Sequence, residues 1–165
     1  MQLVVGLGNP GGQYQRQRHN IGFILLDQHA LEKGYVWEDQ AKFNSLFIKD
    51  EDRIFLKPQT YMNNSGSAVS KVLSFYKIEP KDLVVIHDDL DLDFGRIKKV
   101  FDSDSAGHHG VEDIIEKIGT KEFTRLRVGI GRPRLKEQVN DYVLSDFSHE
   151  ELTEIIKLDI FSLLL

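Results

Sequence analysis

The stretch Gln2 to Phe23 reads QLVVGLGNPGGQYQRQRHNIGF, and it decides the fold class of this chain. It begins with the apolar, β-prone run Leu3 to Val5, breaks on glycines and a proline, and resumes as an amphipathic helix pattern at Ile21. A strand followed by a glycine turn, with a titratable side chain such as His19 at the next helix start, is typical of α/β enzymes. The sequence therefore predicts an α/β fold with a site at the carboxyl end of its first strand.

The spacing Gly6-x-Gly8-x-x-Gly11 also matches a dinucleotide-binding fingerprint. That fingerprint requires a helix to start at its last glycine, so that main-chain N–H groups face a pyrophosphate. Here Pro10 removes one donor, and the polar run Gln13 to Arg18 separates the glycines from the helix pattern. A nucleotide-dependent oxidoreductase is therefore an alternative that rests on glycine spacing alone.

Length and composition bound the remaining possibilities. A chain of 165 residues suits a single domain, residues 1–165, and it can bury a core without disulfides or a structural metal. The absence of cysteine excludes disulfides and thiolate metal sites, and it fits a reducing compartment. We find no secretory signal pattern and no apolar run near the ~20 residues of a membrane span. We therefore expect a cytoplasmic protein, and the net charge of −5 argues against a general nucleic-acid binder.

Strand and helix patterns alternate along the rest of the chain without repeats or a linker, which favours one α/β domain. We expect strands at residues 45–48, 53–56, 83–86, 96–100 and 124–130, and helices at 21–32, 68–76 and 110–118. The first helix places Ile21, Leu25 and Leu31 at helical offsets, and Gly34 stops it. Ser148 opens a last helix as a capping box with Glu151.

An acidic cluster follows the apolar run at residues 83–86 and reads HDDLDLD. A calcium loop starting at Asp89 would need glycine at position six and glutamate at position twelve, where this chain has Phe94 and Val100. We therefore interpret Asp89 to Asp93 as a solvated turn. Asp88 differs, because it lies nearest the carboxyl end of the strand, where open α/β sheets carry their sites.

His19 and Asp88 form the most plausible chemical pair. A carboxylate that accepts a hydrogen bond from one imidazole nitrogen fixes the tautomer and makes the other nitrogen a better base. Such a pair can activate water without a serine nucleophile. Ser65 and Ser67 do not lie in a nucleophile elbow, so we expect them to cap a helix.

Three asparagines lie in loops near the ends of strands or helices. For Asn64 we expect turn formation and helix capping. For Asn9 and Asn63 two roles stay open, either the same structural role or contact with a peptide group or polarised carbonyl.

The segment around the last expected strand is basic. Its cationic residues are Arg125, Arg127, Arg132, Arg134 and Lys136. From the charge pattern, a solvated sheet edge and a phosphate-binding patch are equally good interpretations.

Taken together, several segments resemble those of bacterial peptidyl-tRNA hydrolases in order and spacing, from Leu3 to about Leu144. They read GLGNPGGQYQRQRHNIGF, KPQTYMNNSG, HDDLDL, AGHHGVEDI and FTRLRVGIGRP. The resemblance implies a twisted mixed β-sheet flanked by helices on both faces, acting as a monomer without metal or cofactor. The implied activity in translation is hydrolysis of the ester between a peptide and the 3′-terminal ribose of tRNA. Peptidyl-tRNA is thus the implied partner of a tRNA-binding hydrolase.

The same resemblance implies roles for individual residues. His19 is the implied general base, Asp88 its orienting carboxylate, and Asn63 the amide that positions the water and the carbonyl. Asn9 is implied to distinguish a blocked peptidyl group from a free aminoacyl group. Further implied substrate contacts are Tyr14, Tyr61 and Met62 in the groove, and Arg127 toward the tRNA phosphates.

The chain departs from the family pattern in three places. His109 stands where the family has a substrate-binding asparagine, and the preceding loop carries Asp102 and Asp104, which repel phosphate. The segment from Asp159 to Leu165 is an apolar tail where relatives continue through a longer C-terminal helix, so that helix looks shortened. These departures motivate an alternative function, an RNA-associated scaffold that has lost turnover.

Overall fold

The computed structural model describes residues 1–164 and contains one mixed seven-stranded sheet, in the order β2-β3-β4-β1-β5-β7-β6. The strands are β1 (Gln2–Gly6), β2 (Glu38–Gln40), β3 (Ser45–Lys49), β4 (Arg53–Pro58), β5 (Leu83–Asp89), β6 (Ile97–Phe101) and β7 (Thr124–Gly129). The four central strands, from β4 to β7, run parallel, and antiparallel strands complete both sides of the sheet.

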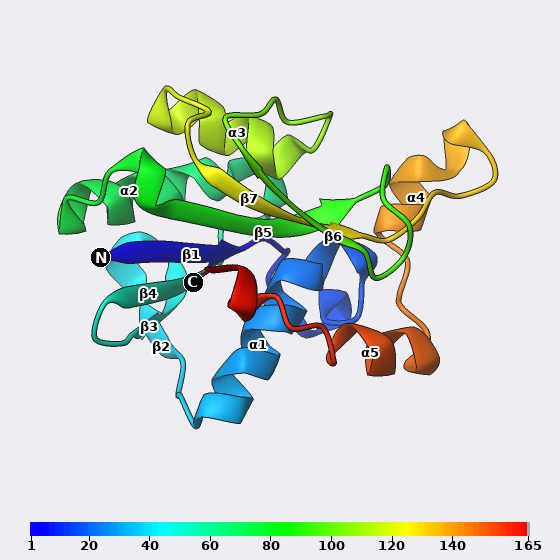
Figure 1. The fold of residues 1–165 in the computed structure, drawn as a ribbon, viewed down its shortest axis with the longest axis horizontal. Helices are drawn as coiled ribbons and strands as arrows, with labels where there is room; N and C mark the ends of the chain where they lie inside the picture. The colour runs from blue at the N-terminus through cyan, green and yellow to red at the C-terminus, as the bar shows by residue number, and fades with distance from the viewer. Residues whose placement is uncertain (165) are drawn as a thin grey trace.

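Helices cover both faces of the sheet, as the resemblance implied. They are α1 (Ile21–Lys33), α2 (Ser65–Tyr76), α3 (His109–Ile118), α4 (Val139–Val143) and α5 (His149–Ile155). Figure 1 shows α2 and α3 on one face, with α1 and α5 on the other. The expected α/β fold is confirmed. None of the helices in the described part of the chain is long and apolar enough to cross a membrane.

The alternation of side chains along β1 divides the core into two clusters. Leu3 and Val5 point into the cluster beneath α2 and α3, whereas Val4 points into the cluster beneath α1. All three side chains are fully buried, which is worth about 1.5–3 kcal/mol for each. Because β1 is buried on both faces, its sequence reads as a continuous apolar run.

Most expected boundaries are confirmed to within a few residues. Gly34 and Gly119 end α1 and α3 in the left-handed conformation, with φ of 70° and 78°. The capping box of Ser148 and Glu151 is present at the start of α5. The placement of Leu31 on the buried face of α1 was wrong, because its side chain is 76% exposed.

Helix capping differs from the expectation at α2. Asn64 occupies the N-cap position, but its side chain makes no capping hydrogen bond. The Ser65 hydroxyl donates to the Met62 carbonyl oxygen at 2.7 Å, so it stabilises the preceding turn rather than a free helix N–H.

The two arginines of β7 do not lie at a solvated edge. β7 is an interior strand, because β6 lies outside it. Arg125 is only 1% exposed, and Arg127 forms an ion pair with Asp89, which is itself buried. Asp89 is therefore not part of a solvated turn, since it belongs to β5 and neutralises a cation of the neighbouring strand.

The glycines of the opening stretch allow α1 to start directly against the end of β1. A Cβ atom added to Gly6 would lie 2.4 Å from the Gly22 carbonyl oxygen, and one added to Gly22 would lie 2.4 Å from the Leu7 nitrogen. Gly11 is followed by a short 3₁₀ turn, Gly12–Tyr14, and not by α1. These glycines therefore serve helix–strand contact and do not present the helix start that a dinucleotide fingerprint requires.

Candidate active site

The candidate site lies where the strand order reverses, at the carboxyl ends of β1 and β5. The chain leaves β1 toward β4 on one side, while β5 pairs with β1 on the other. Such switch points form crevices in open α/β sheets. His19 lies in the 3₁₀ turn Arg18–Asn20 just before α1, and its Nδ1 is 2.9 Å and 3.0 Å from the two carboxylate oxygens of Asp88. The predicted pairing of these residues is thus present.

A second imidazole contacts the same carboxylate. His108 Nε2 lies 2.9 Å from Asp88 Oδ1, and His108 Nδ1 accepts a hydrogen bond from the Val111 main-chain nitrogen at 3.3 Å. His108 is the N-cap of α3, so the start of that helix is connected to the Asp88 carboxylate. His108 was not singled out from the sequence as a site residue, unlike its neighbour His109. Its position just after Gly107 and just before a predicted helix was the available signal.

A third histidine contacts Asp88 through the main chain. His87 Nδ1 lies 2.8 Å from the Asp88 carbonyl oxygen, and Arg125 Nη1 lies 3.1 Å from His87 Nε2. Arg125 also donates from Nη2 to the Asp104 carbonyl oxygen at 2.5 Å. Arg125 therefore connects β7 to the loop that leads into His108.

These contacts select one tautomer for each ring. The Asp88 carboxylate accepts from His19 Nδ1–H and from His108 Nε2–H. The guanidinium of Arg125 can only donate, so His87 Nε2 is an acceptor and its proton is on Nδ1. The hydrogen bond from His19 Nδ1 leaves its Nε2 as the basic nitrogen.

The electrostatic environment shifts the pKa values of His19 and His87 in opposite directions. Burial lowers the pKa of His19, but the Asp88 carboxylate more than offsets this and raises the pKa above its usual value of 6.5. Burial, together with nearby His108 and Arg125, holds the pKa of His87 well below 6.5. Burial opposes ionisation of Asp88, yet the His19 and His108 rings outweigh it and hold the pKa of Asp88 well below its usual range.

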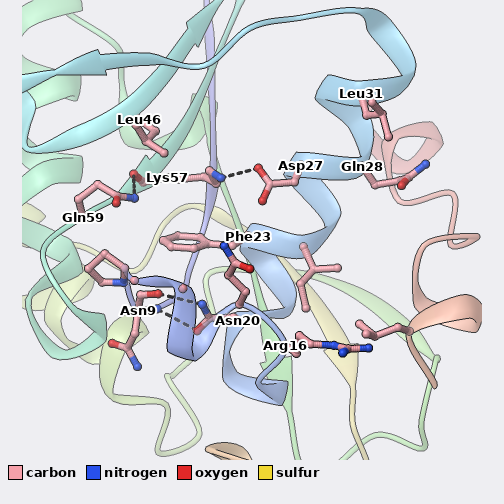
Figure 2. A pocket seen from close by; sticks show the side chains of 16 residues that line it. Asn9, Arg16, Asn20, Phe23, Asp27, Gln28, Leu31, Leu46, Lys57 and Gln59 are labelled. Atoms are coloured by element: carbon pink, nitrogen blue, oxygen red, sulfur yellow. Dashed lines mark hydrogen bonds and ion pairs between the residues drawn. The ribbon is translucent and has the colours of Figure 1, made fainter. Parts of the chain in front are cut away.

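A pair of asparagines fixes the glycine loop beside His19. Asn20 is buried, its Oδ1 accepts from the Asn9 nitrogen, and its Nδ2 donates to the Asn9 carbonyl oxygen, both at 2.9 Å (Figure 2). Asn9 Oδ1 accepts from the Met62 nitrogen at 2.7 Å. Asn9 Nδ2 has no hydrogen-bond partner among residues 1–164, so it can donate to a substrate. Asn20 was not singled out from the sequence, because its role depends on a contact with the loop.

The turn that carries Asn63 is strained. Tyr61 has φ of 63° and ψ of 154°, a conformation that favours glycine and costs on the order of 1–3 kcal/mol. The Tyr61 side chain is 54% exposed, whereas Met62 is buried in the core beneath α2 and α3. Asn63 follows with an exposed side chain. The strain accompanies a sharp turn that offers the Met62 N–H to Asn9.

Two other residues predicted to contact substrate differ in exposure. The His109 side chain is 76% exposed, with Nδ1 3.3 Å from Glu112 Oε2, and it borders the same surface depression as Asn63. Tyr14 is half-buried in the turn that follows the glycine loop. A small cavity of about 130 Å³ contains His19, Asp88 and His108.

His19, Asp88 and His108 are also the residues that could hold a metal ion. One nitrogen or oxygen from each lies within 4.8 Å of the others. Imidazole and carboxylate ligands suit several divalent transition metals. However, His19 Nδ1 and His108 Nε2 are already hydrogen-bonded to the Asp88 carboxylate, and a metal bound through these atoms would replace those hydrogen bonds.

Comparison with known proteins gives one consistent family. The family model described as peptidyl-tRNA hydrolase matches residues 3–160. The peptidyl-tRNA hydrolase of Aquifex aeolicus is 48% identical over 163 residues, which cover 95% of this chain and 85% of that protein. The enzyme of the same name from Mesoplasma florum is 43% identical over 159 residues, covering 94% of this chain and 86% of the relative.

Solved structures agree with the sequence comparison. The crystal structure of peptidyl-tRNA hydrolase from Acinetobacter baumannii superposes with a TM-score of 0.86 at 37% sequence identity. The superposition covers 94% of this chain and 81% of that structure. Sequence and fold comparisons therefore lead to the same family.

Proposed function

The chain belongs to the peptidyl-tRNA hydrolase family, and we propose that it cleaves the ester between the peptide and the 3′-terminal ribose of tRNA with a water molecule activated by His19. The observation that carries this mechanism is the hydrogen bond between His19 Nδ1 and the Asp88 carboxylate at 2.9 Å. It leaves Nε2 as the basic nitrogen.

In the proposed reaction, His19 Nε2 takes a proton from water as the water oxygen attacks the ester carbonyl. The developing imidazolium is stabilised by Asp88, which stays ionised. The tetrahedral intermediate then breaks its bond to the ribose oxygen, and His19 returns the proton to that leaving group. No covalent enzyme intermediate is required.

Two amides complete the proposed site. Asn63 has an exposed side chain, and we assign it to the attacking water and the substrate carbonyl. Asn9 is held by Asn20 and Met62 with Nδ2 available, which supports its assignment to the peptide group next to the ester. A free aminoacyl group lacks that peptide group, so Asn9 is proposed to select blocked substrates.

The tRNA is assigned to the β7 side of the site. The ion pair with Asp89 uses Arg127 Nε, and we assign the two terminal nitrogens of the guanidinium to a phosphate. His109 lines the cavity that contains His19, and we propose that Tyr14, Tyr61 and His109 contact the terminal nucleotide or the peptide. Met62 contributes through its main-chain nitrogen and its packing.

We further propose that residues 1–165 act as one domain and as a monomer in the cytoplasm, with no metal or cofactor. The mechanism supports a reaction without metal or cofactor, because water, one base and its carboxylate account for every proton transferred.

The deciding experiment is the His19→Ala substitution, assayed as peptide release from N-blocked aminoacyl-tRNA. A positioned general base contributes about 10²–10⁴-fold, so kcat should fall by that factor while tRNA binding persists. His149→Ala is the matched control, because His149 is exposed on α5. Turnover within a few-fold of wild type in His19→Ala would contradict the mechanism. Binding without release by the wild-type chain would favour the scaffold alternative.

A further inference from the structure

Three side chains that can bind a metal ion come from separate elements and meet beside the proposed base. His19 precedes α1, Asp88 lies near the end of β5, and His108 is the N-cap of α3. None of the three side chains is more than 14% exposed, and one nitrogen or oxygen from each lies within 4.8 Å of the others. Two imidazoles and one carboxylate form a ligand set that binds Zn²⁺ in other enzymes.

The ligand atoms lie close to the spacing of a tetrahedral site. Bonds of about 2.1 Å at tetrahedral angles place neighbouring ligand atoms about 3.4 Å apart. His19 Nδ1 and His108 Nε2 are each 2.9 Å from an Asp88 oxygen, so both distances need to open by only about 0.5 Å. The two nitrogens, which are at most 4.8 Å apart, need to approach each other by at most about 1.4 Å.

The cavity beside these residues provides space for the ion and a fourth ligand. It has a volume of about 130 Å³ and is lined by all three side chains. A water molecule takes up about 30 Å³ in the liquid, so a metal-bound water fits. Mg²⁺ and Ca²⁺ prefer shells of six or more oxygen ligands, so two imidazoles select against them. The ligand set therefore favours Zn²⁺ and similar divalent transition metals.

We propose that such an ion binds between these three residues and inhibits the hydrolase, an inference that rests on the proposed function. A neutral imidazole carries one proton, and His19 holds it on Nδ1 toward the Asp88 carboxylate. When the ion occupies Nδ1, that proton moves to Nε2. Nε2 can then no longer accept a proton from water, so the ion removes the base that the reaction requires.

The ion changes the tautomer of His108 in the opposite sense. In the structure His108 Nε2 donates to Asp88, and Nδ1 accepts from the Val111 main-chain nitrogen at 3.3 Å. An ion on Nε2 moves the proton to Nδ1, which then cannot accept from Val111. Binding therefore removes the N-cap hydrogen bond of α3, a change that metal binding at surface histidines would not produce.

The first measurement is peptide release from N-blocked aminoacyl-tRNA with free Zn²⁺ held at fixed concentrations by a metal buffer. A reaction without protein corrects for ester cleavage by the ion itself. At saturating Zn²⁺ the rate should fall at least about 100-fold, because a general base contributes about 10²–10⁴-fold. A chelator should restore the rate, and Mg²⁺ at the same concentration should not inhibit.

Two histidine variants test the position of the site. Losing a contact that only orients a ligand lowers metal affinity about 10–100-fold, and losing a ligand should cost at least as much. For His108→Ala, the Zn²⁺ concentration that halves the variant's own metal-free rate should therefore rise at least about tenfold. His109→Ala is the matched control, because His109 is exposed beside it and contacts Glu112. Equal sensitivity of His108→Ala and wild type, or lost sensitivity in His109→Ala alone, would contradict the assignment.

The second measurement does not depend on activity. Co²⁺ should give the absorption of tetrahedral coordination in wild type and lose it in His108→Ala. With Zn²⁺, ¹⁵N NMR should show both His19 and His108 changing tautomer and the Val111 amide losing its hydrogen bond. A wild-type chain that cleaves substrate but shows neither inhibition nor these signals would overturn the inference and leave the hydrolase function intact. Failure of the metal-free chain to cleave would overturn the proposed function, and the inhibition with it.

Discussion

His19 and His87 lie on two sides of Asp88 and have opposite properties. His19 contacts the carboxylate, is partly exposed, and has a raised pKa. His87 contacts the main-chain carbonyl of the same residue, is buried beside Arg125, and has a pKa well below 6.5. Of these two histidines only His19 contacts the carboxylate, so His19 becomes a base whereas His87 stays a neutral structural ring.

The buried residues His87 and Arg125 support the Asp88 carboxylate through the loop before α3. Arg125 holds both His87 and the Asp104 carbonyl, and that loop leads to His108, which contacts the Asp88 carboxylate. A buried guanidinium left without acceptors would cost several kcal/mol, so these contacts resist rearrangement. The site is thus pre-organised from the interior of the sheet outward.

The largest test of this contrast is Asp88→Asn, which removes the charge that distinguishes the two histidines. We expect kcat/KM to fall by about 10³–10⁴-fold, because an amide at this position no longer fixes the His19 tautomer or stabilises the imidazolium. The pKa of His19 should also fall below 6.5, since burial then acts unopposed. Peptide release and a ¹⁵N-histidine titration measure the two effects.

Asp39→Asn serves as the control, because Asp39 is exposed on β2 and far along the sheet order from β5. If Asp88→Asn and Asp39→Asn retained similar activity, the carboxylate would have no catalytic role.

A smaller effect is expected from pH alone. The base must be neutral, so kcat/KM should fall about tenfold per pH unit below the pKa of His19, with the midpoint above 6.5. His87 should remain neutral through that range in the folded protein. Because the unfolded chain protonates His87 near 6.5, this group should lower the free energy of unfolding as the pH falls below that value. If His19 and His87 both titrated above pH 6.5, the opposite pKa shifts of the two histidines would be contradicted.

The smallest effect is expected at the rim, from His109→Asn. The amide offers two donors and an acceptor, whereas the neutral imidazole offers one donor and one acceptor on a bulkier ring. We expect a gain of only a few-fold in kcat/KM, because the His109 side chain is 76% exposed. The control is His149→Asn. An unchanged rate for His109→Asn would remove residue 109 from the site.

The sequence by itself determined most of the elements and the main chemical pair, but not the short β2 and α4. The apolar runs, the glycine stops after α1 and α3 and the Ser148 capping box are local signals, and local signals survive into the fold. His19 and Asp88 could also be paired from the sequence, because both follow strands whose carboxyl ends meet at one edge of the sheet.

Only the tertiary structure decided which polar residues are buried and what each of them contacts. Arg125 and Asp89 look solvated in a charge pattern, yet β6 covers β7 and buries them. His108 and Asn20 have no motif that predicts a partner, because their contacts with Asp88 and Asn9 join segments whose separation in space depends on packing. Residue type and spacing report local conformation, whereas a hydrogen bond across strands depends on how the helices pack on the sheet.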